Sequence, residues 1–183
     1  MKTARGVFGS KAYSEFDMVN ANAYAFASYN EKMKYLFPNG IPTSAGEVGK
    51  YIVTVAVPIT TKDGEKKTQN VRIHRALADE LVYVLQMAQY SGFKAYEVQG
   101  YVWRSARGSD VISMHALGCA VDINTAENPM LSLGQVDYWR ERTNEYSILE
   151  DGILVYTFKS IGWGWGGDWK TKKDFMHFSY TGL

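Results

Sequence analysis

Apolar residues recur along the chain at the spacings of helices and strands. Between residues 17 and 37, and again between residues 75 and 90, they repeat at steps of three and four positions, which predicts two amphipathic helices. A proline, an asparagine and a glycine at residues 38–40 should end the first helix, and residues 39–49 are predicted to be a loop. Gly92 follows the second helix and is placed to cap its C-terminus.

Runs of β-branched residues indicate strands. Residues 51–57 form one strand, which Pro58 should end, and extended structure resumes at residues 70–73 after a turn at residues 62–65, so the pair is predicted to be a hairpin. The later segments are predicted as a strand at 95–101, a buried strand at 119–123, a loop at 127–134, helices at 136–146 and 150–161, a glycine–aromatic loop or edge strand at 162–169, and a final strand at 175–180. Strands and helices mix without a βαβ rhythm, which favours an α+β fold with a central antiparallel sheet flanked by helices.

Length and composition are those of one ordinary globular domain. The chain has 183 residues, of which 46% are hydrophobic and 21% are charged, so it is long enough to bury a sizeable core. We expect a single domain over residues 1–183, with an N-terminal helical appendage at 1–50 and the core of the domain at 51–183. The single cysteine, Cys119, rules out an internal disulfide, and its apolar neighbours predict a buried thiol that does not contact a metal.

Charge and hydropathy argue against several classes of partner. The net charge of +1 provides no electrostatic basis for binding nucleic acid or an anionic membrane. No apolar run approaches the ~20 residues that a membrane span needs. The first residues are not followed by an apolar segment, so the sequence predicts no signal peptide. Nothing in the composition implies a protein partner.

A histidine and an aspartate seven positions apart, His115 and Asp122, are the first candidates for chemistry. On a helix such positions lie about 10.5 Å apart, and on a straight strand they lie about 23 Å apart on opposite faces. Two ligands of one zinc ion must both lie about 2.0–2.2 Å from it, so the chain must reverse between them. Gly118 is placed to allow this reversal because glycine accepts positive φ angles.

A second stretch, from Asp174 to His177, adds a further carboxylate and a further imidazole. With His115 and Asp122 it supplies two neutral nitrogens and one carboxylate oxygen, which together with a position open to water are typical of catalytic zinc sites. A lone histidine is more often structural, but two histidines that each have a carboxylate nearby favour a metal site. His74 has no suitably spaced carboxylate beside it, so we expect it to be an ordinary residue at a strand–helix junction.

Each candidate also has a simpler explanation. A salt bridge or a helix cap would satisfy the carboxylate of Asp122 within its apolar strand, as a metal ion would. Asp174 suits a general base that acts on zinc-activated water, but it also fits a surface aspartate after a run of lysines, and Asp168 is a rival base. Arg104 could stabilise an oxyanion or hold a substrate carboxylate, or it could be a surface charge.

The two stretches together resemble the zinc D-alanyl-D-alanine carboxypeptidase and L-alanyl-D-glutamate endopeptidase family of peptidoglycan peptidases. The first family motif is Ser-x-His-x-x-Gly-x-Ala-x-Asp, and its fixed positions are filled by Ser113, His115, Gly118, Ala120 and Asp122. The second is Asp/Glu-x-x-His, filled by Asp174 and His177, with aspartate where many members have glutamate. An upstream Gly-Tyr…Arg element resembles Gly100, Tyr101 and Arg104. The resemblance covers about residue 94 to residue 183 and is weaker over 51–91, whereas residues 1–45 have no counterpart.

Membership of this family implies a fold, a cofactor and residue roles. The fold would be the one shared with lysostaphin-type peptidases and the hedgehog signalling domain, with residues 51–183 as the catalytic core. The cofactor would be one Zn²⁺, and its ligands would be His115, Asp122 and His177. Asp174 would be the catalytic base. Arg104 and Ser113 would bind the substrate carboxylate or the developing oxyanion.

The resemblance also implies a reaction, the hydrolysis of an amide bond in the stem peptides of peptidoglycan. Residues 165–180 are similar to the closing segment of the endopeptidase branch, which favours an L-alanyl-D-glutamate endopeptidase. An endopeptidase needs a groove open at both ends, and residues 162–169 are a candidate wall, although tryptophans such as those at 163, 165 and 169 are more often core residues. A D-alanyl-D-alanine carboxypeptidase is the alternative, and a non-enzymatic, zinc-bearing wall-binding domain is a second one.

The expected place of action is the bacterial cell wall. A bacterial protein would act in the periplasm or outside the cell. A phage-encoded, endolysin-like protein would act after release from the cytoplasm.

Overall fold

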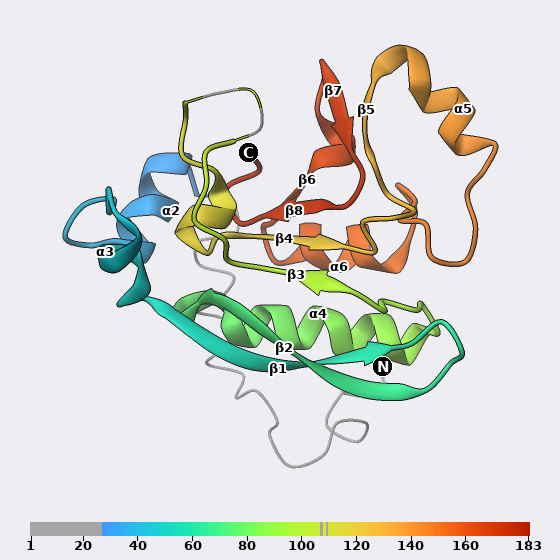
Figure 1. Cartoon of the computed structure of the whole chain (residues 1–183), viewed down its shortest axis with the longest axis horizontal. Coiled ribbons are helices and arrows are strands. Elements are labelled where there is room, and N and C mark those ends of the chain that lie inside the picture. The colour runs from blue at the N-terminus through green and yellow to red at the C-terminus, as the bar shows by residue number, and fades with distance from the viewer. Residues whose placement is uncertain (1–26, 107, 109) are drawn as a thin grey trace.

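Three small antiparallel sheets and several helices make up the described part of the chain (Figure 1). The structure is a computed structural model and describes residues 27–106, 108 and 110–183. The strands are β1 (Ile52–Thr60), β2 (Lys66–His74), β3 (Val98–Gln99), β4 (Ala120–Ile123), β5 (Met130–Ser132), β6 (Gly164–Trp165), β7 (Lys172–Asp174) and β8 (His177–Ser179). The α-helices are α2 (Tyr29–Leu36), α3 (Ala45–Gly49), α4 (Ala78–Ser91), α5 (Val136–Arg140) and α6 (Ile153–Ser160). The 3₁₀ helices are η2 (Arg75–Leu77), η3 (Met114–Leu117), η4 (Leu133–Gln135) and η5 (Gly166–Asp168).

The four-stranded sheet carries two of the candidate residues at its centre. Its strands lie in the order β3–β4–β8–β6, and each neighbouring pair is antiparallel. Asp122 in β4 pairs directly with His177 in β8, and the neighbouring pair of Val121 and Phe178 is fully buried. Successive side chains of a strand point to opposite faces of the sheet. One face therefore packs into the core, and the other presents Asp122 and His177.

Strands β1 and β2 form the hairpin predicted from the sequence, and this long hairpin packs across helix α4 (Figure 1). Val57 and Ile59 are the buried side chains of β1. The prediction that Pro58 ends this strand was wrong, because β1 continues to Thr60 and Pro58 pairs with Thr68. A two-stranded sheet leaves one edge of each strand open, so a residue without an N–H is tolerated there.

The first helix of the described residues begins later than predicted and is packed into the rest of the protein. Helix α2 begins at Tyr29 because Ser28 has an extended backbone and forms a capping box with Glu31. The part of the predicted helix at residues 17–26 lies outside the described residues. Met33 is only 2% exposed and belongs to the hydrophobic core. The division of the chain into an appendage at 1–50 and a core at 51–183 stays a prediction.

Two segments differ from their predicted secondary structure. In both, the cause is a contact with residues that lie elsewhere in the sequence. In the segment predicted as a strand at 95–101, only Val98–Gln99 pairs, because the N–H groups of Tyr96 and Glu97 bond to the side-chain oxygen of Asn124 instead. The predicted loop at 127–134 contains β5, which pairs with β7. This pairing joins segments about forty positions apart in the sequence, and no local pattern indicates it.

The helix boundaries also follow from local capping. Ser44 caps the short helix α3 inside the predicted loop at 39–49. The helix predicted at 136–146 ends at Arg140, and Asn144 then accepts the N–H of Tyr146 in a local turn that competes with helix formation. The helix predicted at 150–161 begins only after Gly152.

The predicted fold class is confirmed in its coarse form. The described chain mixes α-helices with antiparallel strands, but the strands form three small sheets where the sequence predicted one central sheet. This architecture is compatible with the zinc peptidase fold, and the specific hedgehog-like arrangement stays a prediction. Within the described ranges, none of the helices has the length and apolar character needed to cross a bilayer.

His74 lies at the junction of β2 and η2, as expected, and is 2% exposed. Its Nε2 donates a hydrogen bond to the Leu36 carbonyl at 3.1 Å, and its Nδ1 accepts the Ala76 N–H at 3.2 Å. The rings of Phe37 and Tyr51 lie 5.1 Å and 5.5 Å from the imidazole. Burial lowers the pKa of His74 from 6.5 to about 4.

The lowered pKa of His74 predicts a loss of stability in acid. Between pH 6.5 and about pH 4 the folded protein keeps this imidazole neutral, whereas the unfolded chain protonates it. Its contribution to the free energy of unfolding is therefore fully present above pH 6.5 and falls by about 3 kcal/mol as the pH drops to about 4. Chemical denaturation of the wild type and of His74→Gln, from pH 7.5 to 4, should show the wild type losing more stability. Parallel pH curves for the two proteins would contradict the prediction.

Candidate metal centre

A short 3₁₀ helix and a tight turn place His115. Ser113 caps η3, and its Oγ accepts the His115 N–H at 3.2 Å. Gly118 follows in the left-handed conformation, with φ of 68°. A Cβ at Gly118 would lie 2.9 Å from the backbone nitrogen of His74, so a larger residue could not fit without movement of the backbone. The chain reversal predicted from the spacing therefore occurs at Gly118.

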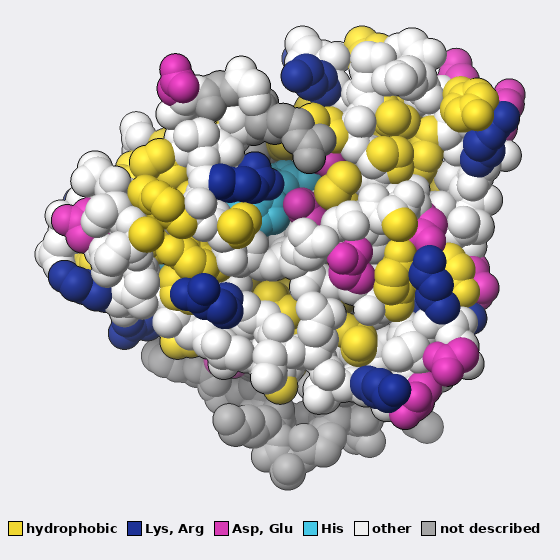
Figure 2. All heavy atoms as spheres, viewed as in Figure 1, with side chains coloured by type: hydrophobic (Ala, Val, Ile, Leu, Met, Phe, Trp, Pro, Cys, Tyr) yellow, Lys and Arg dark blue, Asp and Glu magenta, His cyan; other side chains and the backbone are white. Residues whose placement is uncertain are grey.

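The side chains of His115, Asp122 and His177 face one another. His115 Nε2 lies 3.1 Å from Asp122 Oδ1 and 3.2 Å from His177 Nδ1, and His177 Nδ1 lies 3.0 Å from Asp122 Oδ1. Ligands about 2.1 Å from a tetrahedral zinc ion lie about 3.4 Å apart, so the donor set matches such an ion. Within the described ranges, these three residues form the group that could hold a metal ion. Figure 2 shows histidine at a hollow of the surface, with basic and acidic side chains beside it.

Backbone carbonyls hold each imidazole with one nitrogen toward this group. His115 Nδ1 donates to the Gly100 carbonyl at 2.9 Å, and His177 Nε2 donates to the Leu183 carbonyl at 3.1 Å. In the neutral rings the other two nitrogens carry lone pairs, so three hydrogen-bond acceptors converge and none of them donates. A proton or a cation must lie among them to hold them together. The sequence indicates neither carbonyl, because a backbone oxygen has no residue-type signal.

The surroundings of Asp122 favour its ionised, carboxylate form. Burial raises the pKa of Asp122, but the contacts with His115 and His177, through which the imidazoles share protons with the carboxylate, outweigh it and hold the pKa well below its usual range. Burial lowers the pKa of His177, but the hydrogen bond to Asp122 and the negative charge there raise it overall. The site thus stabilises positive charge beside Asp122. A metal ion would take the place of the proton, since histidine binds metals in its neutral form.

Asp174 lies next to the group, across a short turn. It is the last residue of β7, and His177 is the first residue of β8 three positions further on, after a turn at residues 175–176. The two are close enough for the charge of Asp174 to raise the pKa of His177. Gly166 packs against Asp174, because a Cβ on Gly166 would lie only 2.9 Å from the Asp174 Cβ.

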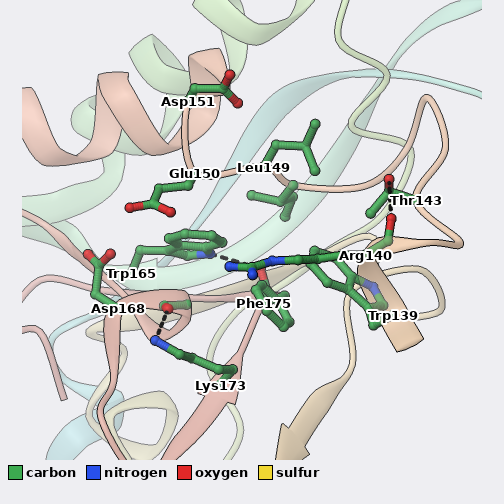
Figure 3. Close-up of a pocket in the computed structure, with 12 residues that line it drawn as sticks. Trp139, Arg140, Thr143, Leu149, Glu150, Asp151, Trp165, Asp168, Lys173 and Phe175 are labelled. Atoms are coloured by element: carbon green, nitrogen blue, oxygen red, sulfur yellow. Dashed lines mark hydrogen bonds between the residues drawn. The ribbon is translucent and has the colours of Figure 1, made fainter. Parts of the chain in front are cut away.

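Asp168 belongs instead to a cavity on the other side of β7 (Figure 3). The cavity has a volume of about 440 Å³, and Lys173 and Phe175 line it, whereas Asp174 between them does not. Neighbouring residues of a strand point to opposite faces, so the cavity and Asp174 lie on opposite sides of this segment. Asp168 pairs with Lys159 at 2.7 Å. Asp168, the alternative candidate for the base, therefore faces away from the metal group, by which we mean His115, Asp122 and His177.

Arg104 and Ser113 lie side by side on the segment that leads to η3. The Ser113 N–H donates to the Arg104 carbonyl at 3.2 Å, next to the antiparallel bridge between Ser105 and Ile112. The Arg104 side chain is exposed, and its guanidinium donates to the Ser105 carbonyl at 3.3 Å. Ser113 is buried and its hydroxyl oxygen already accepts the His115 N–H, which gives it a structural task that the sequence did not predict.

The glycine–aromatic segment is mainly core, which limits its predicted role as a groove wall. Trp163 and Trp165 are 2% and 3% exposed and belong to the hydrophobic core, although Trp165 also lines the cavity to which Asp168 belongs. Trp169 is half-buried, and its ring lies 5.3 Å from the His177 ring. Cys119 is fully buried, and its thiol contacts the Leu117 carbonyl at 3.3 Å. Burial raises the pKa of this thiol, as expected for an unreactive cysteine.

Comparison with known proteins supports the family that the motifs resemble. Residues 107–180 match the model of a zinc peptidase family described as D-alanyl-D-alanine carboxypeptidase. The matched segment contains His115, Asp122, Asp174 and His177. Neither the curated proteins nor the solved structures contain a significant match to the chain. The family match and the His–Asp–His group together support a metallopeptidase of the class that acts on peptidoglycan.

Proposed function

We propose that this protein is a zinc-dependent endopeptidase that cuts the stem peptides of peptidoglycan between L-alanine and D-glutamate, and that it acts at the bacterial cell wall. The observation that carries the proposal is the convergence of His115 Nε2, Asp122 Oδ1 and His177 Nδ1 within 3.2 Å of one another. Three converging acceptors would destabilise a hydrophobic core, because buried polar atoms without hydrogen-bond donors cost free energy. A Lewis-acidic cation requires such a set, and these residues lie in the segment that matches the family.

In this proposal His115, Asp122 and His177 hold the zinc ion. When bound, zinc acts as a Lewis acid that acidifies water and polarises the carbonyl of the scissile amide. The carbonyls of Gly100 and Leu183 keep the two imidazoles neutral and correctly turned, since each accepts the one ring proton at 2.9 Å and 3.1 Å.

Asp174 acts as the general base in the proposed reaction. Its carboxylate takes a proton from the attacking water and later delivers it to the nitrogen of the leaving amine. Two observations favour it over Asp168. It lies across a two-residue turn from His177, and it faces away from the cavity to which Asp168 belongs. Asp168 is also engaged by Lys159 at 2.7 Å.

Arg104 and Ser113 bind the substrate in this proposal. The exposed guanidinium of Arg104 offers several donors to a substrate carboxylate or to the oxygen on which negative charge develops. The Ser113 hydroxyl accepts the His115 N–H, and its own hydrogen can donate to the same substrate oxygen. Because these two residues are held together by the bond between their backbones, they would act on one part of the substrate.

The endopeptidase assignment rests on the similarity of residues 165–180 to that branch of the family. A D-alanyl-D-alanine carboxypeptidase is the second candidate, and the description of the matching family model favours it. In that reaction Arg104 would bind the terminal carboxylate of the substrate through paired hydrogen bonds. The two reactions share the metal group and differ in their products.

Zinc content tests the proposed ligands. Protein prepared without chelators should contain about one zinc ion per chain, and His115→Ala or His177→Ala should abolish this content because each removes one of three ligands. His74→Gln is the matched control, since His74 is the third histidine and lies outside the group. Stoichiometric zinc in both alanine variants would show that the ligand assignment is wrong.

Exchange of each aspartate for asparagine separates the base from its rival. Asp174→Asn should retain zinc and lower turnover by roughly 10²-fold or more, because an amide does not accept a proton as a carboxylate does. Asp168→Asn makes the same chemical change on the far side of β7 and should leave turnover close to that of the wild type. Loss of zinc in Asp174→Asn would make Asp174 a ligand. The reverse pattern of activities would identify Asp168 as the base.

The products of peptidoglycan digestion distinguish the reactions. Mass analysis of purified wall treated with the protein, with and without a chelator, should find new N-terminal D-glutamate only without the chelator. Free D-alanine with no new glutamate amine would instead establish the carboxypeptidase. If a zinc-loaded protein released neither product, the non-enzymatic wall-binding alternative would replace both.

A further inference from the structure

We propose that residues 181–183 position the metal ligand His177 and that Trp169 holds these residues in place. The inference rests on the proposed function, because it takes His177 as a zinc ligand. It assigns a task to a segment that contains none of the motif residues. Trp169 is a positioning residue in this proposal and touches neither the metal nor the substrate.

The carbonyl of Leu183 determines which nitrogen of His177 carries the proton. It accepts a hydrogen bond from His177 Nε2 at 3.1 Å, so the proton of the neutral ring lies on Nε2 and the lone pair lies on Nδ1, toward Asp122 and His115. The tautomer of a histidine follows the hydrogen bond that its other nitrogen makes. Without this carbonyl the proton could move to Nδ1, where the Asp122 carboxylate would accept it and the lone pair needed for a metal would be lost.

Trp169 contacts residues 181–183 and His177 at the same time. Its Nε1 donates to the Gly182 carbonyl at 3.1 Å, and its ring lies 5.3 Å from the His177 ring. Gly182 also packs closely on the edge strand β6, because a Cβ on Gly164 would lie 2.5 Å from the Gly182 Cα. One indole thus contacts both the histidine and the segment that orients it.

The residue before this segment is fixed independently. The Tyr180 N–H donates to the Cys119 carbonyl at 2.9 Å, and the Tyr180 carbonyl accepts a hydrogen bond from Lys32 Nζ at 2.8 Å. Lys32 belongs to helix α2 and is 6% exposed. The three residues after Tyr180 therefore start from a fixed point and return to His177. The side chain of Leu183 is 59% exposed, so the backbone carbonyl carries the effect.

Zinc affinity and the hydrogen bond of His177 Nε2 test the inference together. A chain that ends at Thr181 should bind zinc about 10- to 100-fold more weakly, which is the usual effect of removing a partner that orients a ligand. Trp169→Phe should weaken binding about 10-fold, because it keeps a ring and removes the N–H. Affinity is measured by competition with a chelator. In the zinc-loaded proteins, NMR should find the His177 Nε2–H hydrogen-bonded and slow to exchange with water in the wild type, and faster to exchange in both variants.

Two matched variants serve as controls. Leu183→Ala keeps the backbone carbonyl and should bind zinc as the wild type does. Trp139→Phe removes an equivalent indole N–H, which donates to the Glu127 carbonyl at 2.8 Å, and should also leave the affinity unchanged.

The inference is overturned if the wild type binds zinc and the shortened chain and Trp169→Phe bind it equally well. It is also overturned if Leu183→Ala weakens binding as much as the shortening does, since the side chain would then be responsible. Should the shortened chain fail to fold, Trp169→Phe decides by the same affinity and NMR measurements. A wild type that binds no zinc contradicts the proposed function itself, so the two failures are distinguishable.

Discussion

The convergence of three acceptor atoms at one buried point is the constraint on which the rest of this structure depends. His115 Nε2, Asp122 Oδ1 and His177 Nδ1 repel one another unless a positive charge lies among them, and they persist only on a rigid support. The pairing of Asp122 with His177 across β4 and β8 supplies two of them at a fixed separation. The turn at Gly118 brings the third back onto the same face of the sheet.

Support for His115 comes from the hairpin of β1 and β2, which carries none of the three ligand candidates. Gly100, whose carbonyl holds His115 Nδ1, lies so close to β2 that a Cβ there would be 2.2 Å from the Arg72 carbonyl. The Gly118 carbonyl accepts the His74 N–H at 2.9 Å at the end of the same strand. The hairpin in turn packs on α4, so the position of one imidazole is set by the hydrophobic core. A substitution in that core would therefore affect the position of His115 through Gly100 and Gly118.

The segment from Lys173 to Phe175 has two faces with different neighbours. Asp174 lies close enough to His177 for its charge to act there. Lys173 and Phe175, by contrast, line the cavity to which Asp168 belongs (Figure 3). The stacking of Phe175 on Trp139, with ring centroids 3.7 Å apart, holds this segment to α5. One carboxylate is thus kept near the metal group, and the other is engaged by a lysine on a different face.

The sequence by itself indicated the three residues that converge, the reversal at Gly118, the hairpin, helix α4 and the buried strand around Asp122. These features follow from local spacing and from the conformational preferences of single residues, which act over a few positions. Only the tertiary structure decided that the Gly100 and Leu183 carbonyls turn the imidazoles, that Ser113 caps the helix of His115, and that Asp168 faces away from the site. Each of these depends on atoms that are far apart in the sequence or on backbone groups common to every residue. Their positions are set by how the sheets and turns pack, and residue types along the chain do not record that packing.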